Sequence, residues 1–410
     1  MSEKLLEAIG NISDQMIADA APSGKAHTGR AVPVWIKWTA AAATFALILS
    51  VGGHTLTPGS TTATLPMLTL GEDDSMGMGF EGYMAYDISE LTSGNPWTEE
   101  AHLTTLPVFE NPFIYDEQTC NVTNTDIRVL KDRLKETAAR LGMDTDSVPI
   151  LDSNDRLSEQ QKQNMKEKIK VMEAEGYVFP EGAFDPSYYY MESGGIRVEM
   201  DLSLNTAVYF EPAASLPEEY NFTHYASYDD KLHAAEYLLE EYSGLIAMEN
   251  PVISISGGDY NIYGERSFNI SFYDGSGSLT QQILSYNFDS VFFACDDDGK
   301  LFLARLQPQQ ELSRTGDYPI ISVKEAKSLL LEGKYVTTCT EPVENEKYIL
   351  KAELVYRTGR LPYYIPYYRF YVELPDMERG NGLKTYGAYY VPAVEQQYIS
   401  DVPQWDGSFN

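Results

Sequence analysis

An apolar stretch near the N-terminus, residues 34–53, constrains the possible folds of this chain more than any other feature. It has the sequence VWIKWTAAAATFALILSVGG and carries no charge from Trp38 to Gly53. A helix of this length, at about 1.5 Å per residue, crosses a hydrocarbon layer of about 30 Å. The sequence therefore predicts one transmembrane helix over residues 34–53. A cleaved signal peptide and a buried globular helix are the alternatives for this stretch.

The basic residues around this stretch predict its orientation. Lys25, Arg30 and Lys37 lie before it or at its start, whereas no Lys or Arg occurs in the forty residues that follow it. Basic residues are retained on the cytoplasmic side of a membrane. We therefore expect a single-pass protein of the cell membrane, with the membrane as a partner, a cytoplasmic N-terminus and an extracellular C-terminal domain.

Charge and cysteine content exclude some classes of protein. The chain of 410 residues has a formal charge of −31, and all of this excess lies after the apolar stretch. Such a field repels nucleic acid, so no nucleic-acid partner is expected. Cys120, Cys295 and Cys339 are too few for a disulfide framework. Free thiols in an external domain favour a bacterial protein.

The rest of the chain shows helical patterns followed by strand patterns, in an order that repeats three times. We expect an α+β fold, with one N-terminal transmembrane helix followed by modules of a helix packed on an antiparallel sheet. The predicted parts are a cytoplasmic tail (1–33), the transmembrane helix (34–53), a flexible linker (54–105) and three α+β modules (106–220, 221–312 and 313–410).

Particular segments carry these patterns. Helices are predicted over 126–141, 158–175, 228–246 and 322–332. Asn124 or Thr125 can cap the first of them, and Ser322 with Glu325 predicts a capping box at the start of the last. Asp274-Gly275 and Asp298-Gly299 predict hairpin turns. Strands are predicted over 195–200, 206–210, 251–256, 266–274, 281–295, 300–306, 348–358, 367–374 and 385–394.

The third module resembles a known kind of domain. Its segments SVKEAKSLLLEGKY, AELVYRTG, PYYRFYVEL and YYVPAV follow one another from residue 322 to residue 394. This order is similar to PepSY-like domains and to the YycH/YycI accessory proteins of bacterial two-component signalling, in which a helix precedes strands with a P-x-Y-R-F type segment. The resemblance implies a non-enzymatic extracytoplasmic sensor or regulatory domain.

The N-terminal tail carries a second resemblance. Residues 5–20, LLEAIGNISDQMIADA, form an amphipathic helical pattern. The segment is similar to the cytoplasmic start of clostridial single-pass proteins of the anti-sigma-factor-like kind. It implies a cytoplasmic protein partner, for example a sigma factor or a histidine kinase; binding to the inner leaflet and simple disorder are the alternatives. The residues expected to contact a partner are Leu5, Ile9, Ile12, Met16 and Ile17.

The residues that usually carry catalysis do not form a recognisable motif. The five histidines are not spaced for zinc, and no nucleophile elbow or phosphate-binding loop occurs. The sequence therefore predicts no enzymatic activity, no cofactor and no metal site. The run Asp296–Asp298 before Gly299 leaves two interpretations open, a hairpin turn and a calcium site.

Tyrosine is unusually frequent near the C-terminus, with eleven between Tyr348 and Tyr398. Tyrosine suits half-buried strands, so packing is one interpretation. The other is an aromatic face that binds a glycan or peptide, because a rigid amphipathic ring loses little entropy on binding. The residues that would form this face are Tyr363, Tyr364, Tyr367 and Tyr368.

These observations together predict a membrane-anchored extracytoplasmic protein that acts by binding as a sensor or regulator. It would bind an extracellular ligand and signal to a sigma factor or a histidine kinase through its tail. The alternatives are a cell-wall-associated hydrolase or peptidase and a passive ligand-binding scaffold. The sequence does not specify the ligand, the oligomeric state or the direction of signalling.

Overall fold

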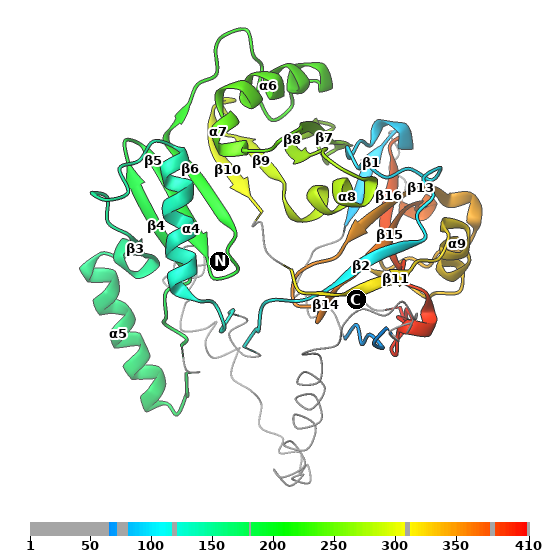
Figure 1. Cartoon of the computed structure of the whole chain (residues 1–410), viewed down its shortest axis with the longest axis horizontal. Helices are drawn as coiled ribbons and strands as arrows, with labels where there is room; N and C mark the ends of the chain where they lie inside the picture. The colour runs from blue at the N-terminus through cyan, green and yellow to red at the C-terminus, as the bar shows by residue number, and fades with distance from the viewer. Residues whose placement is uncertain are drawn as a thin grey trace, which may run out of the picture. The chain divides into compact units, whose positions relative to one another are not determined.

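The computed structural model describes residues 65–410, with gaps at 72–80, 117–120, 180–181, 308–311, 378–381 and 408–410. The predicted tail and transmembrane helix, residues 1–53, lie outside the described residues. The unit Leu65–Asn410 contains three antiparallel sheets of eight, five and three strands (Figure 1).

The eight-stranded sheet has the strand order β3-β4-β5-β6-β10-β9-β8-β7. Alternate residues of its strands are buried, for example Val198 and Met200 in β5 and Val208 and Phe210 in β6, so one face is apolar. Its strands are β3 (Leu151–Asp152), β4 (Tyr188–Ser193), β5 (Ile196–Asp201), β6 (Thr206–Ala214), β7 (Pro251–Tyr260), β8 (Arg266–Asp274), β9 (Val291–Cys295) and β10 (Leu301–Leu306).

Two amphipathic helices cover this apolar face. In α4 (Ile127–Arg140), Leu130, Leu134 and Ala138 recur every four residues and are fully buried in the same cluster as the sheet residues. The second helix, α6 (Tyr228–Glu241), starts at a capping box and is followed by the short α7 (Ser243–Ile246). Helix α5 (Glu159–Ala174) buries no residue and lies at the edge of the molecule (Figure 1).

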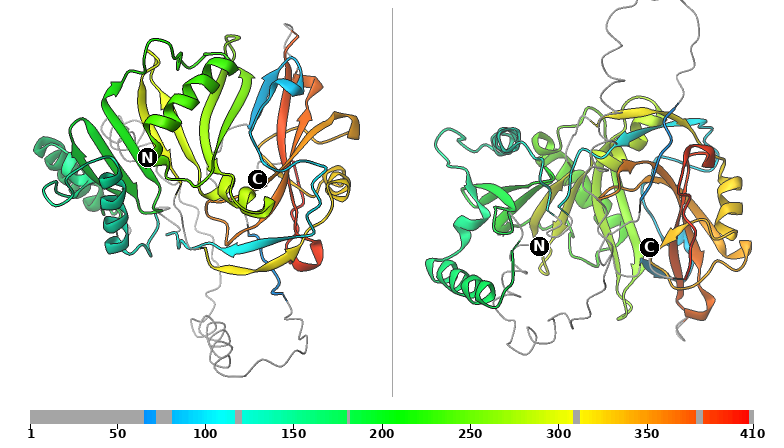
Figure 2. Two further views of the ribbon diagram at one scale, coloured as in Figure 1. Left: turned by 45° about the horizontal axis from the view of Figure 1, so that its top comes forward. Right: turned by 90° about the horizontal axis from the view of Figure 1, so that it is seen from below.

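The five-stranded sheet has the order β1-β16-β15-β13, and β12 pairs with β16. On one face Tyr368, Phe370 and Val372 of β15 join an apolar cluster with α9 (Val323–Leu331). Figure 2 shows β1 beside β16, although 298 residues of sequence separate their ends. The strands are β1 (Gly82–Ala85), β12 (Val336–Thr337), β13 (Ile349–Tyr356), β15 (Pro366–Glu373) and β16 (Lys384–Pro392).

A small sheet and a helix join these parts. The three-stranded sheet has the order β11-β2-β14, with β2 (Thr105–Glu110) between β11 (Arg314–Pro319) and β14 (Tyr363–Tyr364). Helix α8 (Leu279–Phe288) contacts both β8 and β13, and Ile283 lies fully buried in the cluster that α9 also joins. The eight-stranded and five-stranded sheets therefore share an apolar boundary.

The predicted fold class is wrong in its first element. Among the described residues, no helix is both long enough and apolar enough to cross a membrane. Even α5, with 16 residues, is rich in Lys and Glu, and charged side chains are costly in hydrocarbon. The structure instead combines six α-helices with three sheets over the described part of the chain.

The predicted module boundaries differ from the observed sheets. Strand β6 of the expected first module pairs with β10 of the expected second, so these two modules share one sheet. The described parts of the expected linker, 54–105, are ordered, because β1 pairs with β16 and both Leu68 and Trp97 are buried. Residues 281–295, expected as a strand, form α8 and then β9.

Candidate functional site

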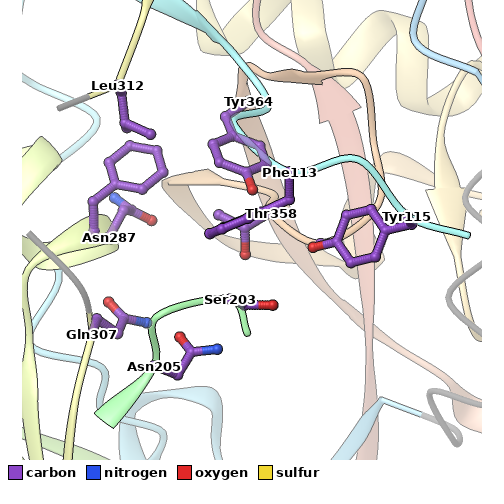
Figure 3. Close-up of a pocket in the computed structure, with 11 residues that line it drawn as sticks. Phe113, Tyr115, Ser203, Asn205, Asn287, Gln307, Leu312, Thr358 and Tyr364 are labelled. Atoms are coloured by element: carbon purple, nitrogen blue, oxygen red, sulfur yellow. The ribbon is translucent and has the colours of Figure 1, made fainter. Parts of the chain in front are cut away.

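A cavity of about 200 Å³ lies where five separate segments of the chain meet (Figure 3). These are the segment after β2, the turn between β5 and β6, the C-terminal end of α8, the connection between β10 and β11, and the loop that leads into β14. The residues that line it are Phe113, Tyr115, Ser203, Asn205, Asn287, Phe288, Gln307, Leu312, Thr358, Gly359 and Tyr364.

Aromatic rings form one wall of the cavity. The rings of Phe288 and Tyr364 are stacked, with centroids 6.0 Å apart and an interplanar angle of 25°. Behind them Tyr356 packs against Phe288 with a centroid separation of 5.0 Å. The Tyr364 hydroxyl donates a hydrogen bond of 2.9 Å to Asn111 Oδ1, which fixes the ring. This wall is rigid and amphipathic, as stacking surfaces for planar or ring-shaped ligands are.

Amide side chains form the opposite wall, where Figure 3 shows Asn205 and Gln307 near each other. Asn205 Nδ2 donates to Asp201 Oδ2 at 3.0 Å, and Gln307 Oε1 accepts from Ser290 Oγ at 3.1 Å. These bonds orient both amides. Among the described residues they leave Asn205 Oδ1 and Gln307 Nε2 without a partner, so one acceptor and one donor remain for a ligand.

Asn287 has a different role in the same cavity. Its Nδ2 donates to the Ile283 carbonyl at 2.7 Å, and its Oδ1 accepts from the backbone N–H of Tyr356 at 2.9 Å. The first bond holds the side chain against its own helix and the second fastens the end of α8 to β13, so both ends of the amide are used. The polar groups that remain in the cavity are therefore the amides of Asn205 and Gln307 and the hydroxyls of Thr358, Ser203 and Tyr115.

The lining carries no group that is charged at neutral pH. It contains no Asp, Glu, His, Lys, Arg or Cys side chain. The hydroxyls of Tyr115 and Tyr364 stay protonated at neutral pH, because burial raises the pKa of both side chains. Hydrogen bonding and stacking are thus the interactions available, and a general acid or base with a pKa near 7 is not among the lining residues.

The most perturbed carboxyl pKa in the described residues belongs to a separate, buried ionic cluster on the second face of the five-stranded sheet. Burial of Glu353 alone raises its pKa, but the nearby charges of Arg369 and Lys351 and the hydroxyl of Ser93 outweigh this effect and lower the pKa to about 2. Lys351 Nζ lies 2.8 Å from Glu353 Oε1. Because every member of this cluster is paired with another, the cluster has the features of a structural ion pair.

The tyrosines predicted as a binding face lie in different environments. Tyr364 lines the cavity, and Tyr363, beside it in β14, is half-buried. Tyr367 and Tyr368 are buried in opposite faces of the five-stranded sheet and belong to different apolar clusters. The structure therefore brings one of the four to the cavity, and partner binding by the others stays a prediction. The tail residues Leu5, Ile9, Ile12, Met16 and Ile17 lie outside the described residues.

The acidic run Asp296–Asp298 forms the turn between β9 and β10. Asp296 Oδ1 accepts from the backbone N–H groups of Asp298 and Lys300 at 3.0 and 2.8 Å. These bonds are typical of an Asx turn. In the part of the chain that the structure describes, no three His, Cys, Asp or Glu side chains are grouped as metal ligands.

Sequence reasoning did not identify Asn205, Gln307 and Phe288 as site residues. They come from segments that are far apart in the chain and carry no local motif. Asn205 ends the segment DLSLN, residues 201–205, whose residue types predict a turn between two strands and no site. Only tertiary contacts bring these side chains together.

No protein-family model and no curated protein matches this chain. Two solved structures are similar to it at low identity. An uncharacterized protein from Eubacterium rectale ATCC 33656 has 9% identity, covers 74% of this chain and 86% of its own, and gives a TM-score of 0.30. The C-terminal domain of Bacillus megaterium YpeB has 13% identity, covers 64% and 92%, and gives a TM-score of 0.25.

Both TM-scores lie below 0.5, so the resemblance to PepSY-like and YycH/YycI modules stays a prediction from the sequence. Neither TM-score is high enough to transfer an activity, a ligand or a partner to this chain. The function must therefore be argued from the cavity.

Proposed function

We propose that residues 65–410 form a non-catalytic binding module, and that the cavity between α8 and the β5–β6 turn holds a small uncharged ligand. The observation that carries this proposal is the lining itself, in which stacked rings face oriented amides and no ionisable group is charged. Neutral sugars and amide-containing fragments present the matching surfaces, namely an apolar ring face or plane and hydrogen-bonding edges.

The size of the cavity limits the ligand. At about 200 Å³ it is smaller than the ~300–1,000 Å³ of typical pockets for drug-sized molecules. A monosaccharide or a short amide is the expected scale. A polymer such as a glycan chain or a peptide would place one unit in the cavity and its remainder on the surface outside.

A binding screen tests the proposal directly. Full-length protein is titrated with neutral monosaccharides, N-acetylated sugars and blocked dipeptides, each beside a charged analogue of the same size, and binding is followed by calorimetry. The neutral compound of a pair is expected to bind more tightly, because a charge in this cavity loses its hydration without gaining a counterion. Equal binding by the charged analogue contradicts the proposal.

A matched pair of variants locates the binding. Gln307→Leu keeps most of the side-chain volume and removes the amide that faces the cavity, so affinity is expected to fall about tenfold, the effect of ~1.4 kcal/mol from one lost hydrogen bond. Gln163→Leu makes the same change on the exposed side of α5 and is expected to leave affinity unchanged. A ligand that binds both variants equally well occupies another site.

The enzyme alternative is tested in the same material. A ligand that binds and is recovered chemically unchanged after long incubation supports a binding module. Turnover of a bound sugar or peptide that is lost in Gln307→Leu would instead identify the cavity as an active site of the hydrolase or peptidase class.

We further propose that occupancy of the cavity is the input of a sensor, with the N-terminal residues Leu5–Ile17 contacting a protein partner. The amphipathic pattern of that segment supports this extension. Copurification of a sigma factor or histidine kinase with full-length protein, and its loss from Ile12→Asp protein, is the expected result. Copurification that is insensitive to this change contradicts it.

A further inference from the structure

A lysine amine and a cysteine thiol are buried side by side in the eight-stranded half of the molecule. Lys231 on α6 and Cys295 at the end of β9 are both 3% exposed. The distance from Lys231 Nζ to Cys295 Sγ is 4.0 Å. Lysine is rarely buried to this extent without a carboxylate partner, so this pair differs from an ordinary core contact.

The surroundings of Lys231 do not stabilise a positive charge well. Its Nζ lies 3.4 Å from the carbonyl oxygen of Phe222 and 4.7 Å from the centroid of the Phe222 ring. None of the ion pairs among the described residues includes Lys231. Burial consequently lowers its pKa, which increases the fraction of the neutral, nucleophilic amine.

The pKa of the Cys295 thiol shifts in the opposite direction to that of the Lys231 amine. Burial raises the pKa of Cys295, while a positive charge on Lys231 acts against this rise. Among the described contacts of Cys295, the Lys231 amine is the base, and it can accept the thiol proton when an oxidant reaches the sulfur. Cys339, the other described cysteine, is equally buried, but its Sγ faces the Glu81 carbonyl at 3.9 Å.

We propose that Lys231 and Cys295 are the two ends of an oxidative cross-link, formed when hydrogen peroxide reaches the pair. The thiol sulfur attacks peroxide, the O–O bond breaks, and the products are a sulfenic acid on Cys295 and water. The neutral Lys231 amine then attacks that sulfur. An S–N bond forms, the S–O bond breaks, and the amine proton leaves with the hydroxyl as a second water. Sulfur is oxidised, and the peroxide oxygens are reduced.

The cross-link joins α6 to the sheet that this helix covers. Two thiol equivalents reverse it, because they reduce the S–N bond to the free amine and free thiol and become a disulfide themselves. The pair is thus a reversible lock on the packing of α6, and it is independent of the cavity and of the proposed ligand.

Peptide mapping of full-length protein tests the proposal. Cys120→Ser protein, which removes the cysteine outside the described residues, is treated with hydrogen peroxide, quenched with catalase, alkylated and digested with trypsin. The expected product is a Lys231 peptide joined to a Cys295 peptide, with a mass two hydrogens below their sum and no cleavage after Lys231. Dithiothreitol before alkylation should remove it. Cys339 should remain fully alkylated under unfolding conditions.

Two variants separate the cross-link from simple thiol oxidation. Lys231→Met keeps a long apolar side chain at the buried position, and its Cys295 should give the sulfinic or sulfonic acid with no cross-linked peptide. Cys295→Ala should restore cleavage after Lys231 in treated protein. Thermal melting of both variants confirms that they are folded. The proposal is overturned if Cys295 in the Cys120→Ser protein is oxidised only to its acids, or if it does not react before Cys339 does.

Discussion

Glu353 of β13 and Arg369 of β15 are direct register partners in the five-stranded sheet, and both Nε and Nη2 of Arg369 donate to Oε2 of Glu353. The other carboxylate oxygen accepts from Ser93 Oγ at 2.6 Å and lies 2.8 Å from Lys351 Nζ. The Glu353 side chain is only 3% exposed. Lys351 and Arg369 therefore both pair with one buried carboxylate. Mutation or protonation of Glu353 should consequently destabilise the folded sheet.

Glu353→Gln should destabilise the protein by about 3 kcal/mol, because it leaves Lys351 without its counterion and leaves Arg369 with the more distant Glu81 carboxylate, 3.9 Å away. Urea unfolding followed by circular dichroism measures the change. Glu99→Gln is the matched control, since Glu99 pairs with Lys327 at 3.2 Å on the surface and is expected to cost less than ~1 kcal/mol. Similar losses in the two variants would show that the buried cluster adds little to stability.

The same cluster predicts a specific acid sensitivity. The folded pKa of Glu353 is about 2, below its ordinary value of 4.5, so ionised Glu353 favours the folded state. This contribution, about 3 kcal/mol at 1.36 kcal/mol per pKa unit, is complete above pH 4.5 and is lost as the pH falls toward 2. The difference in unfolding free energy between the unmodified protein and Glu353→Gln should shrink over that range. A difference that stays constant from pH 6 to pH 3 contradicts the assignment.

Gly387 in β16 should not tolerate a side chain. A Cβ atom there would lie 2.6 Å from Cys339 Sγ and about 3 Å from Tyr389 and Leu374. Gly387→Ala should therefore cost about 1–3 kcal/mol through overpacking. Gly244→Ala is the control, because a Cβ in α7 meets only the Arg140 carbonyl at 3.8 Å, and there the change should be neutral or slightly stabilising. Thermal melting of both variants makes the comparison.

Tyr368 tests the packing interpretation of the C-terminal tyrosines. Its hydroxyl donates to the Ile321 carbonyl at 2.8 Å, and burial raises its pKa to about 12. Tyr368→Phe leaves that carbonyl without its partner and should lower the unfolding free energy by about 1–2 kcal/mol. Tyr263→Phe, at a side chain that is 81% exposed, should have no measurable effect. A negligible effect at both positions would show that the Tyr368 hydroxyl does not contribute to stability.

The helices could be predicted from sequence where their caps and apolar spacing agree. Segments 126–141 and 322–332 correspond closely to α4 and α9, because leucines recur in both at helical spacing. Ser322 caps α9 as expected, whereas Asp126 caps α4 in place of the expected Asn124 or Thr125. Segment 281–295 was misassigned as a strand because its apolar run outweighed a local signal. That signal is the capping box of Ser278 with Gln281, which starts α8.

The arrangement of the strands could not be predicted in the same way. Alternation identifies a strand but not its neighbour, so the pairing of β2 with β11 and β14 left no trace in the sequence. The cavity depends on that pairing, because one of its lining residues, Tyr364, lies in β14 and another, Asn205, lies in the turn between β5 and β6. The high frequency of tyrosine in this part of the sequence indicates Tyr364 as one of four candidates, but it does not show which of the four lines the cavity.

Ligand binding in the cavity should be nearly independent of pH between 6 and 9. No lining side chain titrates in this range, because Tyr115 and Tyr364 have raised pKa values and the other polar groups are amides and hydroxyls. The nearest sensitive group is Asp201, which orients Asn205 and whose pKa is raised by burial. Protonation of Asp201 removes its negative charge and so weakens the hydrogen bond that Oδ2 accepts from the Asn205 amide.

Calorimetric titration of a neutral ligand across pH 4 to 9 tests this expectation. The affinity should change less than about twofold above pH 6 and should weaken in more acid solution as Asp201 takes up a proton. In Asp201→Asn protein the acid limb should disappear, because an amide at this position does not ionise. A maximum in affinity near neutral pH that persists in this variant would place the bound ligand against a histidine or an amine, and therefore outside the cavity.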